Sequence, residues 1–215
     1  MAIYNPDIPL TFIHIPKTAG SSVSNWLKMH TNANDFYPKS FGSKHWQYKK
    51  VELHMKRSRL DPGRVVVVVR NPWDRLLSMW SYLCNRKGTH TLIYDASGNL
   101  QGGPKRVKNV LNHISSGRKH YHAMSFREFV LESDWSAARS QQTDFFPENA
   151  LILRFENLTQ DFKQIQDMFD ARKHPLPVKN TSQHDEYTSM YDEEMIEEVR
   201  RRASDDIVKL GYEFR

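Results

Sequence analysis

Five consecutive valines, Val65 to Val69, form the longest apolar run in the chain. β-Branched residues favour extended backbone, and a run without polar alternation is typical of a strand that is buried on both faces of a sheet. Strands of this kind occur mainly in parallel sheets whose two faces are covered by helices. The run therefore predicts a central strand of an α/β sheet. Because it is far shorter than the roughly 20 residues that cross a bilayer, we expect no membrane-spanning segment.

Two other segments repeat the pattern of an apolar strand followed by an amphipathic helix. Thr11 to Ile15 precedes a predicted helix at Ser21 to His30, and Ala150 to Phe155 precedes one near Thr159 to Asp170. Alternating strands and helices predict an α/β domain in three layers, with a mostly parallel central sheet flanked by helices. We find no composition shift that marks a boundary, so residues 1–215 are expected to form a single domain.

Local signals predict where other helices begin and end. Asn71 precedes a proline and is suited to cap the helix after the valine run. Ser125 and Glu128 have the spacing of a capping box. Asp192 can cap one long C-terminal helix that ends at Gly211. The segment TLIYDASGNLQ, Thr91 to Gln101, predicts a β-hairpin.

The segment HIPKTAGSS, His14 to Ser22, joins the first predicted strand to its helix. Backbone N–H groups at the start of a helix have no intrahelical partner and attract anions. We expect Gly20 to let a ligand approach the main chain, while charge and hydroxyl groups come from Lys17, Thr18, Ser21 and Ser22. The segment predicts a phosphate site, although a plain strand-to-helix turn with a solvated lysine would have the same composition.

Arg70 follows the valine run directly, and Ser78 lies about two turns into the next helix. Because parallel strands end at the same edge of a sheet, we expect Arg70 and Lys17 to lie close together and to bind a ligand with two phosphates. For the other notable side chains of this segment the sequence favours structural roles. We expect Arg75 to pair with an acidic residue, and Trp73, Trp80 and Tyr82 to pack in the core.

The segments PKTAGSS and VVVVVRNPWDRLLSMWSY together resemble the two phosphate motifs of sulfotransferases that use 3′-phosphoadenosine 5′-phosphosulfate (PAPS). The chain also resembles the carbohydrate-type family, which has bacterial and Golgi members, in the segments KHW, SFREF, RFENL, YDEEMIEEV and GYEF. The resemblance implies a P-loop-like domain without a metal. It assigns the 5′-phosphosulfate to Lys17, Gly20, Ser21 and Ser22, with a further donor from Thr18, and the 3′-phosphate to Arg70 and Ser78.

The resemblance also assigns the general base to His45, in KHW between the two phosphate motifs. A base that titrates near neutrality favours histidine, with an unperturbed pKa of about 6.5. His14 and His54 are other imidazoles near the motifs. Lys17 would neutralise the leaving group, which gives it a catalytic role as well.

The acceptor implied by the resemblance is a hydroxyl group, and we expect a saccharide. The unmatched stretch Asn85 to His122 carries basic residues suited to an acidic saccharide, namely Lys105, Arg106, Lys108, Arg118 and Lys119. A small alcohol, a phenol or a peptide tyrosine remains open. The single cysteine, Cys84, and the absence of a signal-peptide pattern at the N-terminus favour a cytoplasmic location.

Two other classes of protein fit the formal charge of +6. A nucleotide-dependent kinase is disfavoured because the chain lacks the motif G-x-x-x-x-G-K-[ST] and because Arg70, rather than a Mg²⁺-binding carboxylate, follows the valine run. A basic RNA-binding module is permitted by the 12% aromatic content, but none of the usual RNA-binding signatures is present. We therefore expect no nucleic-acid partner.

Overall fold

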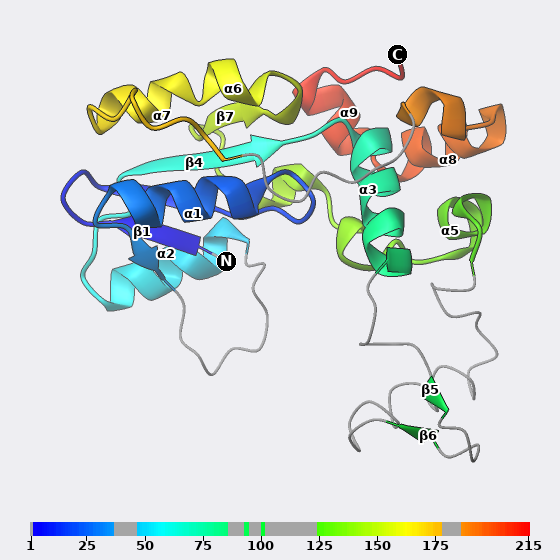
Figure 1. Cartoon of the computed structure of the whole chain (residues 1–215), viewed down its shortest axis with the longest axis horizontal. Coiled ribbons are helices and arrows are strands. Elements are labelled where there is room, and N and C mark those ends of the chain that lie inside the picture. Colours follow the sequence, from blue (N-terminus) through cyan, green and yellow to red (C-terminus); the bar gives the residue numbers. More distant parts are fainter. Residues whose placement is uncertain (1, 37–46, 86–92, 95–99, 102–123, 178–185) are drawn as a thin grey trace.

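The computed structural model describes residues 2–36, 47–85, 93–94, 100–101, 124–177 and 186–215 (Figure 1). Within these ranges the main sheet has five strands in the order β3-β1-β2-β4-β7. They are β1 (Ala2–Asn5), β2 (Leu10–Ile13), β3 (Asn34–Asp35), β4 (Arg64–Val69) and β7 (Leu151–Arg154). A separate antiparallel pair, β5 (Ile93–Tyr94) with β6 (Leu100–Gln101), confirms the predicted hairpin.

The main sheet is mixed. β4 lies between β2 and β7 and runs parallel to both, whereas β1 runs antiparallel to β2 and β3. The prediction of a mostly parallel sheet is not confirmed, because two of the four strand pairings of the main sheet are antiparallel. The reason is a tight reversal after β1, where the Ile8 N–H donates to Asn5 Oδ1 at 2.8 Å and the chain returns at once into β2.

The valine run is buried on both faces of the sheet, as predicted. Val66 and Val68 belong to one hydrophobic cluster, with Trp26 of α1 (Gly20–His30), whereas Val67 and Val69 belong to the other, with Met55 of α2 (Tyr48–Arg57). Since successive side chains of a strand point to opposite faces, an unbroken apolar run supplies both clusters at once. The prediction of a central strand is confirmed.

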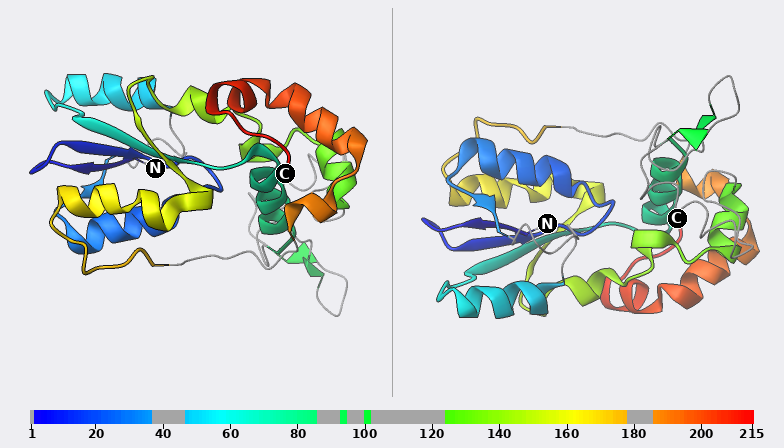
Figure 2. Two further views of the ribbon diagram at one scale, coloured as in Figure 1. Left: turned by 90° about the horizontal axis from the view of Figure 1, so that it is seen from above. Right: turned by 90° about the horizontal axis from the view of Figure 1, so that it is seen from below.

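Helices cover both faces of the sheet and extend past one end of it (Figures 1 and 2). The helices α1, α6 and α7 lie on one face, and α2 lies on the other (Figure 2). The α-helices are α1 (Gly20–His30), α2 (Tyr48–Arg57), α3 (Pro72–Asn85), α5 (Phe126–Glu132), α6 (Leu158–Asp161), α7 (Lys163–Met168), α8 (Glu193–Arg202) and α9 (Ser204–Leu210). Short 3-10 helices are η2 (Ser136–Ala138), η3 (Gln142–Phe145), η4 (Phe155–Asn157) and η5 (Tyr187–Met190). The described residues thus form a single α/β domain.

The predicted caps are present, but the C-terminal helix is not continuous. Ser125 and Glu128 form the capping box of α5, and Asp192 Oδ1 accepts from the Met195 N–H at 2.9 Å. Ala203, with φ −108°, divides the expected single helix into α8 and α9, and Gly211, with φ 64°, ends α9. None of the described helices is long and apolar enough to cross a membrane.

Candidate functional site

The loops that follow β2 and β4 meet at one edge of the sheet. The two strands are parallel neighbours, so their carboxyl ends lie side by side. Arg70 Nη1 donates to the Lys17 carbonyl at 3.3 Å. The structure therefore brings together the two cations that the sequence predicted at one edge, and it does so by direct contact between the loops.

The loop after β2 leads into a helix start that suits an anion. Lys17 and Ala19 adopt left-handed backbone, with φ 68° and 61°. Among the described residues no side chain caps α1 at Ala19, and its first turn carries no acidic residue. Backbone N–H groups at such a start are directed toward the loop, where they favour negative charge. This backbone is suited to an anion, and the phosphate site itself stays a prediction.

The Lys17 side chain reaches the C-terminal half of α3. Its Nζ is 4.4 Å from the centre of the Tyr82 ring. Burial and then the nearby Arg70 cation lower the pKa of Lys17 from 10.5 to about 8. An anion beside Lys17 would oppose both effects by stabilising the charged ammonium, so the site favours a negatively charged group there.

The other residues of this loop divide into exposed and buried groups. Ser21 is exposed, whereas Thr18 and Ser22 are buried. The Thr18 hydroxyl donates to the Ile15 carbonyl at 3.1 Å, so it shapes the loop from within. A Cβ added at Gly20 would lie 2.1 Å from His14 Cδ2. The His14 imidazole thus packs against Gly20 on the side where a Cβ would lie, and the approach of a ligand to the Gly20 backbone stays a prediction.

Arg70 is held in a fixed orientation and is only 6% exposed. Its Nε and Nη2 donate to the two carboxylate oxygens of Asp74, each at 2.7 Å, and its guanidinium lies 3.9 Å from the centre of the Phe155 ring. Ser78 lies one turn beyond Asp74 on α3 and is also buried. Since residues four apart share a helix face, Asp74 and Ser78 continue the face that begins at Arg70.

A family model described as the sulfotransferase family matches residues 1–213. The chain belongs to this family. The match covers both loops and most of the described domain, so the enzyme is a sulfotransferase, and PAPS is the sulfuryl donor that the family implies. No curated protein and no solved structure matches the chain.

The predictions for four further side chains near the sulfotransferase site have different outcomes. Arg75 pairs with Asp206 at 3.9 Å, as predicted. Trp73 is buried and Trp80 is packed against the same core, which is also as predicted. The prediction for Tyr82 is wrong, because its ring is 44% exposed and lies over Lys17.

Sequence reasoning missed the partners of Arg70. Asp74 forms an ion pair with Arg70, and the i,i+4 spacing could have indicated this. Phe155 and Gln142 also contact Arg70, the second through its backbone. Both residues lie more than 70 positions from Arg70 in the sequence, and no local pattern links them to Arg70.

Several predicted site residues of the sulfotransferase lie outside the described residues. These include His45, with the rest of KHW, and most of Asn85 to His122, including Lys105, Arg106, Lys108, Arg118 and Lys119. Of the other imidazoles, His54 lies on α2 with its ring 5.4 Å from that of Phe36. Across the described ranges no three His, Cys, Asp or Glu side chains are grouped to hold a metal ion.

Proposed function

We propose that this sulfotransferase transfers a sulfuryl group from PAPS to a hydroxyl of a carbohydrate. The observation that carries the proposal is the contact between the two cationic loops, in which Arg70 Nη1 donates to the Lys17 carbonyl. This contact supports one site with two places for phosphate, because it joins the two loops at one edge of the sheet. The uncapped start of α1 and the buried, oriented guanidinium of Arg70 suit the two phosphate ends of such a donor.

Each loop has its own role in this proposal. Lys17, Gly20, Ser21 and Ser22 would hold the 5′-phosphosulfate in a P-loop-like cradle, while Thr18 shapes the loop through its bond to Ile15. Arg70 and Ser78 would hold the 3′-phosphate. The guanidinium has five N–H groups, and the contacts with Asp74 and Lys17 use three of them.

PAPS supplies an activated sulfuryl group whose S–O bond to the 5′-phosphate breaks as the acceptor oxygen forms its own bond to sulfur. The electron pair of the broken bond stays on the phosphate oxygen. Lys17 stabilises this developing negative charge, and an anion beside Lys17 raises the pKa of its ammonium from about 8 and keeps it protonated. His45 would take the acceptor proton, so no metal is required by this mechanism.

Binding of adenosine 3′,5′-bisphosphate tests the proposal most directly. We expect titration calorimetry to show binding without added metal, and ATP with Mg²⁺ or an RNA oligomer to bind far more weakly. Tighter binding of either competitor would favour a kinase or an RNA-binding module. Assays with radiolabelled PAPS and a panel of glycans, small alcohols, phenols and tyrosine peptides then identify the acceptor. We expect the glycans to be sulfated.

His45→Ala tests the base. We expect turnover to fall about 10² to 10⁴-fold, the usual contribution of a positioned general base, while the affinity for the bisphosphate is retained. His14→Ala and His54→Ala are the controls, because both imidazoles lie near the motifs. Full activity in His45→Ala, with a loss in one of the controls, would transfer the base to that residue.

The compartment is a further part of the proposal. With only one cysteine the chain cannot form an intrachain disulfide, which suits a reducing, cytoplasmic environment. Fractionation of the producing cells would test it.

A further inference from the structure

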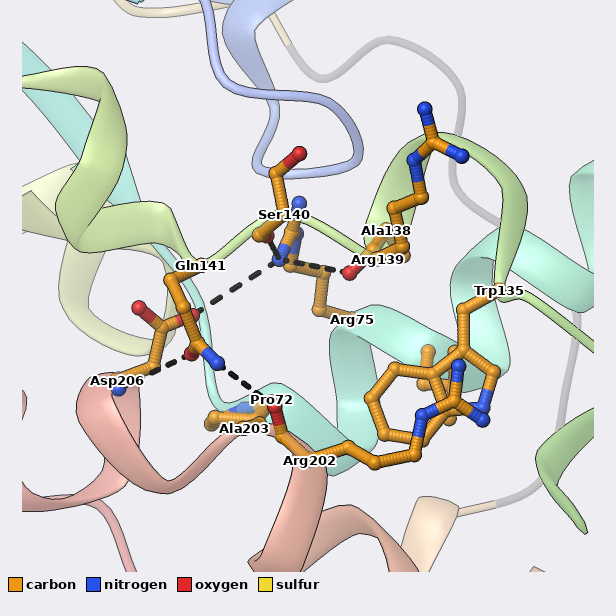
Figure 3. A pocket seen from close by; sticks show the side chains of 11 residues that line it. Pro72, Arg75, Trp135, Ala138, Arg139, Ser140, Gln141, Arg202, Ala203 and Asp206 are labelled. Atoms are coloured by element: carbon orange, nitrogen blue, oxygen red, sulfur yellow. Dashed lines mark hydrogen bonds and ion pairs between the residues drawn. The ribbon is translucent and has the colours of Figure 1, made fainter.

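Three polar side chains form a buried network beneath the two loops. Arg75 of α3, Gln142 of η3 and Asp206 of α9 are 3%, 0% and 1% exposed. Figure 3 shows Arg75 and Asp206 on the wall of a small pocket, with the Gln141 side chain beside them. Buried polar groups destabilise a fold unless they are hydrogen-bonded, so the partners of these three side chains indicate what the network does.

Gln142 binds the backbone of Arg70 through both ends of its amide. Its Oε1 accepts from the Arg70 N–H at 2.9 Å, and its Nε2 donates to the Arg70 carbonyl at 2.8 Å. Arg70 is the first residue after β4, where the pairing with the neighbouring strands ends. The glutamine side chain therefore replaces a strand partner at the residue whose guanidinium would bind the 3′-phosphate.

Arg75 connects the same network to the other loop. Its Nε donates to the Pro16 carbonyl at 3.1 Å, directly before Lys17, and its Nη1 donates to the Ser140 carbonyl at 3.2 Å. Arg75 Nη1 also lies 3.9 Å from Asp206 Oδ2. Arg75 therefore holds the loop after β2 against the segment that leads into Gln142.

Asp206 connects Arg75 to Gln142. Its carboxylate accepts from the Gln142 N–H at 2.8 Å and from the Thr143 N–H at 3.0 Å, and it faces the Arg75 guanidinium. The network thus runs from Pro16 through Arg75 and Asp206 to Gln142 and ends on the Arg70 backbone. Its two ends are the two loops of the site.

We propose that Gln142 is a positioning residue for the sulfuryl donor, because it fixes the Arg70 backbone relative to the Lys17 loop. This inference rests on the proposed function. A network that served stability alone could be replaced by packed apolar residues with little loss, whereas this one makes its terminal contacts on the backbones of the two phosphate loops. In this proposal Gln142 acts on the donor through Arg70.

Gln142→Met tests the inference against a matched control, Gln166→Met. Gln166 is a second buried glutamine, 7% exposed, on α7, and its Nε2 donates to the His174 carbonyl at 2.7 Å. Both substitutions keep the side-chain length and remove the amide. With both variants shown to be folded by near-ultraviolet circular dichroism, we expect Gln142→Met to weaken bisphosphate binding about tenfold, which is about 1.4 kcal/mol, and Gln166→Met to change it less than about twofold.

Each outcome separates the inference from the function on which it rests. If the wild-type protein does not bind the bisphosphate, the proposed function fails. If the wild type binds and Gln142→Met binds equally well, or if both methionine variants lose affinity alike, the positioning role is overturned and the function stands. Should Gln142→Met fail to fold, Gln142→Asn, whose shorter amide cannot reach both Arg70 backbone groups, decides the question in the same way against Gln166→Asn.

Discussion

The two loops of the site are shaped by opposite means. The loop after β2 is built mainly from its own residues, through the Thr18 bond to Ile15, the left-handed backbone at Lys17 and Ala19, and the packing of His14 on Gly20. The loop after β4 depends on partners 72 to 142 residues further along the chain. A short motif therefore encodes much of the first loop, which Arg70 and Arg75 also contact, whereas the second loop depends mainly on residues far along the chain.

This difference accounts for what the sequence could and could not predict. The valine run, the capping box at Ser125 and the meeting of Lys17 with Arg70 follow from local patterns and from the geometry of parallel strands. The contact of Gln142 with Arg70 joins residues that only the completed fold brings together. The break between α8 and α9 at Ala203 was missed because the apolar spacing continues through it.

Lys17→Ala should have the largest effect, since it removes the cation of the self-contained loop. We expect turnover to fall about 10² to 10³-fold, the loss typical of removing one preorganised group that stabilises developing charge. Steady-state rates with radiolabelled PAPS measure this. Lys28→Ala is the control, because Lys28 lies on α1 and its cation pairs with Asp35 of β3. An equal loss in both variants would contradict a role for Lys17 in the site.

Arg70→Ala tests the loop that depends on distant partners. We expect affinity for adenosine 3′,5′-bisphosphate to fall by roughly 1.5 to 3 kcal/mol, the range for hydrogen bonds to charged groups, and calorimetry measures this. Ser78→Ala should lose less. Arg70→Lys should bind with intermediate affinity, because lysine keeps the charge but cannot make bidentate contacts. Unchanged affinity in Arg70→Ala would exclude it as the 3′-phosphate anchor.

Gly20→Ala tests whether the first loop is as self-contained as its contacts indicate. The new Cβ would meet the His14 ring at 2.1 Å, so either the ring or the helix start must move. We expect a loss of roughly 1 to 3 kcal/mol in the free energy of unfolding, as for other overpacked cores, measured by urea titration. The double variant His14→Ala/Gly20→Ala should lose less than the sum of the two single changes. Strict additivity would show that the ring does not cause the strain.

The pH dependence of binding should give the smallest effect and distinguishes the two cations. The pKa of Lys17 is lowered to about 8. Near pH 7 the lysine is mostly protonated, and its contribution to bisphosphate affinity is close to its maximum. As the pH rises through 8 the free protein loses that charge and the affinity falls, by at most tenfold per pH unit. Lys17→Arg should give a flat profile from pH 7 to 9.5, and a slope equal to that of the wild type would assign the titration elsewhere.

The contacts around Asn71, at the start of α3, set an order of events during synthesis. Its backbone N–H donates to Glu156 Oε1 at 2.6 Å, and its Nδ2 donates to the Glu213 carbonyl at 2.9 Å, 142 residues later. A nascent chain that has reached only β7 already contains Lys17 and Arg70 but not α9 or Glu213. Contacts within the loop after β2, such as the Thr18 bond to Ile15, can therefore form before Glu213 has been synthesised, whereas the contact of Asn71 with the Glu213 carbonyl cannot.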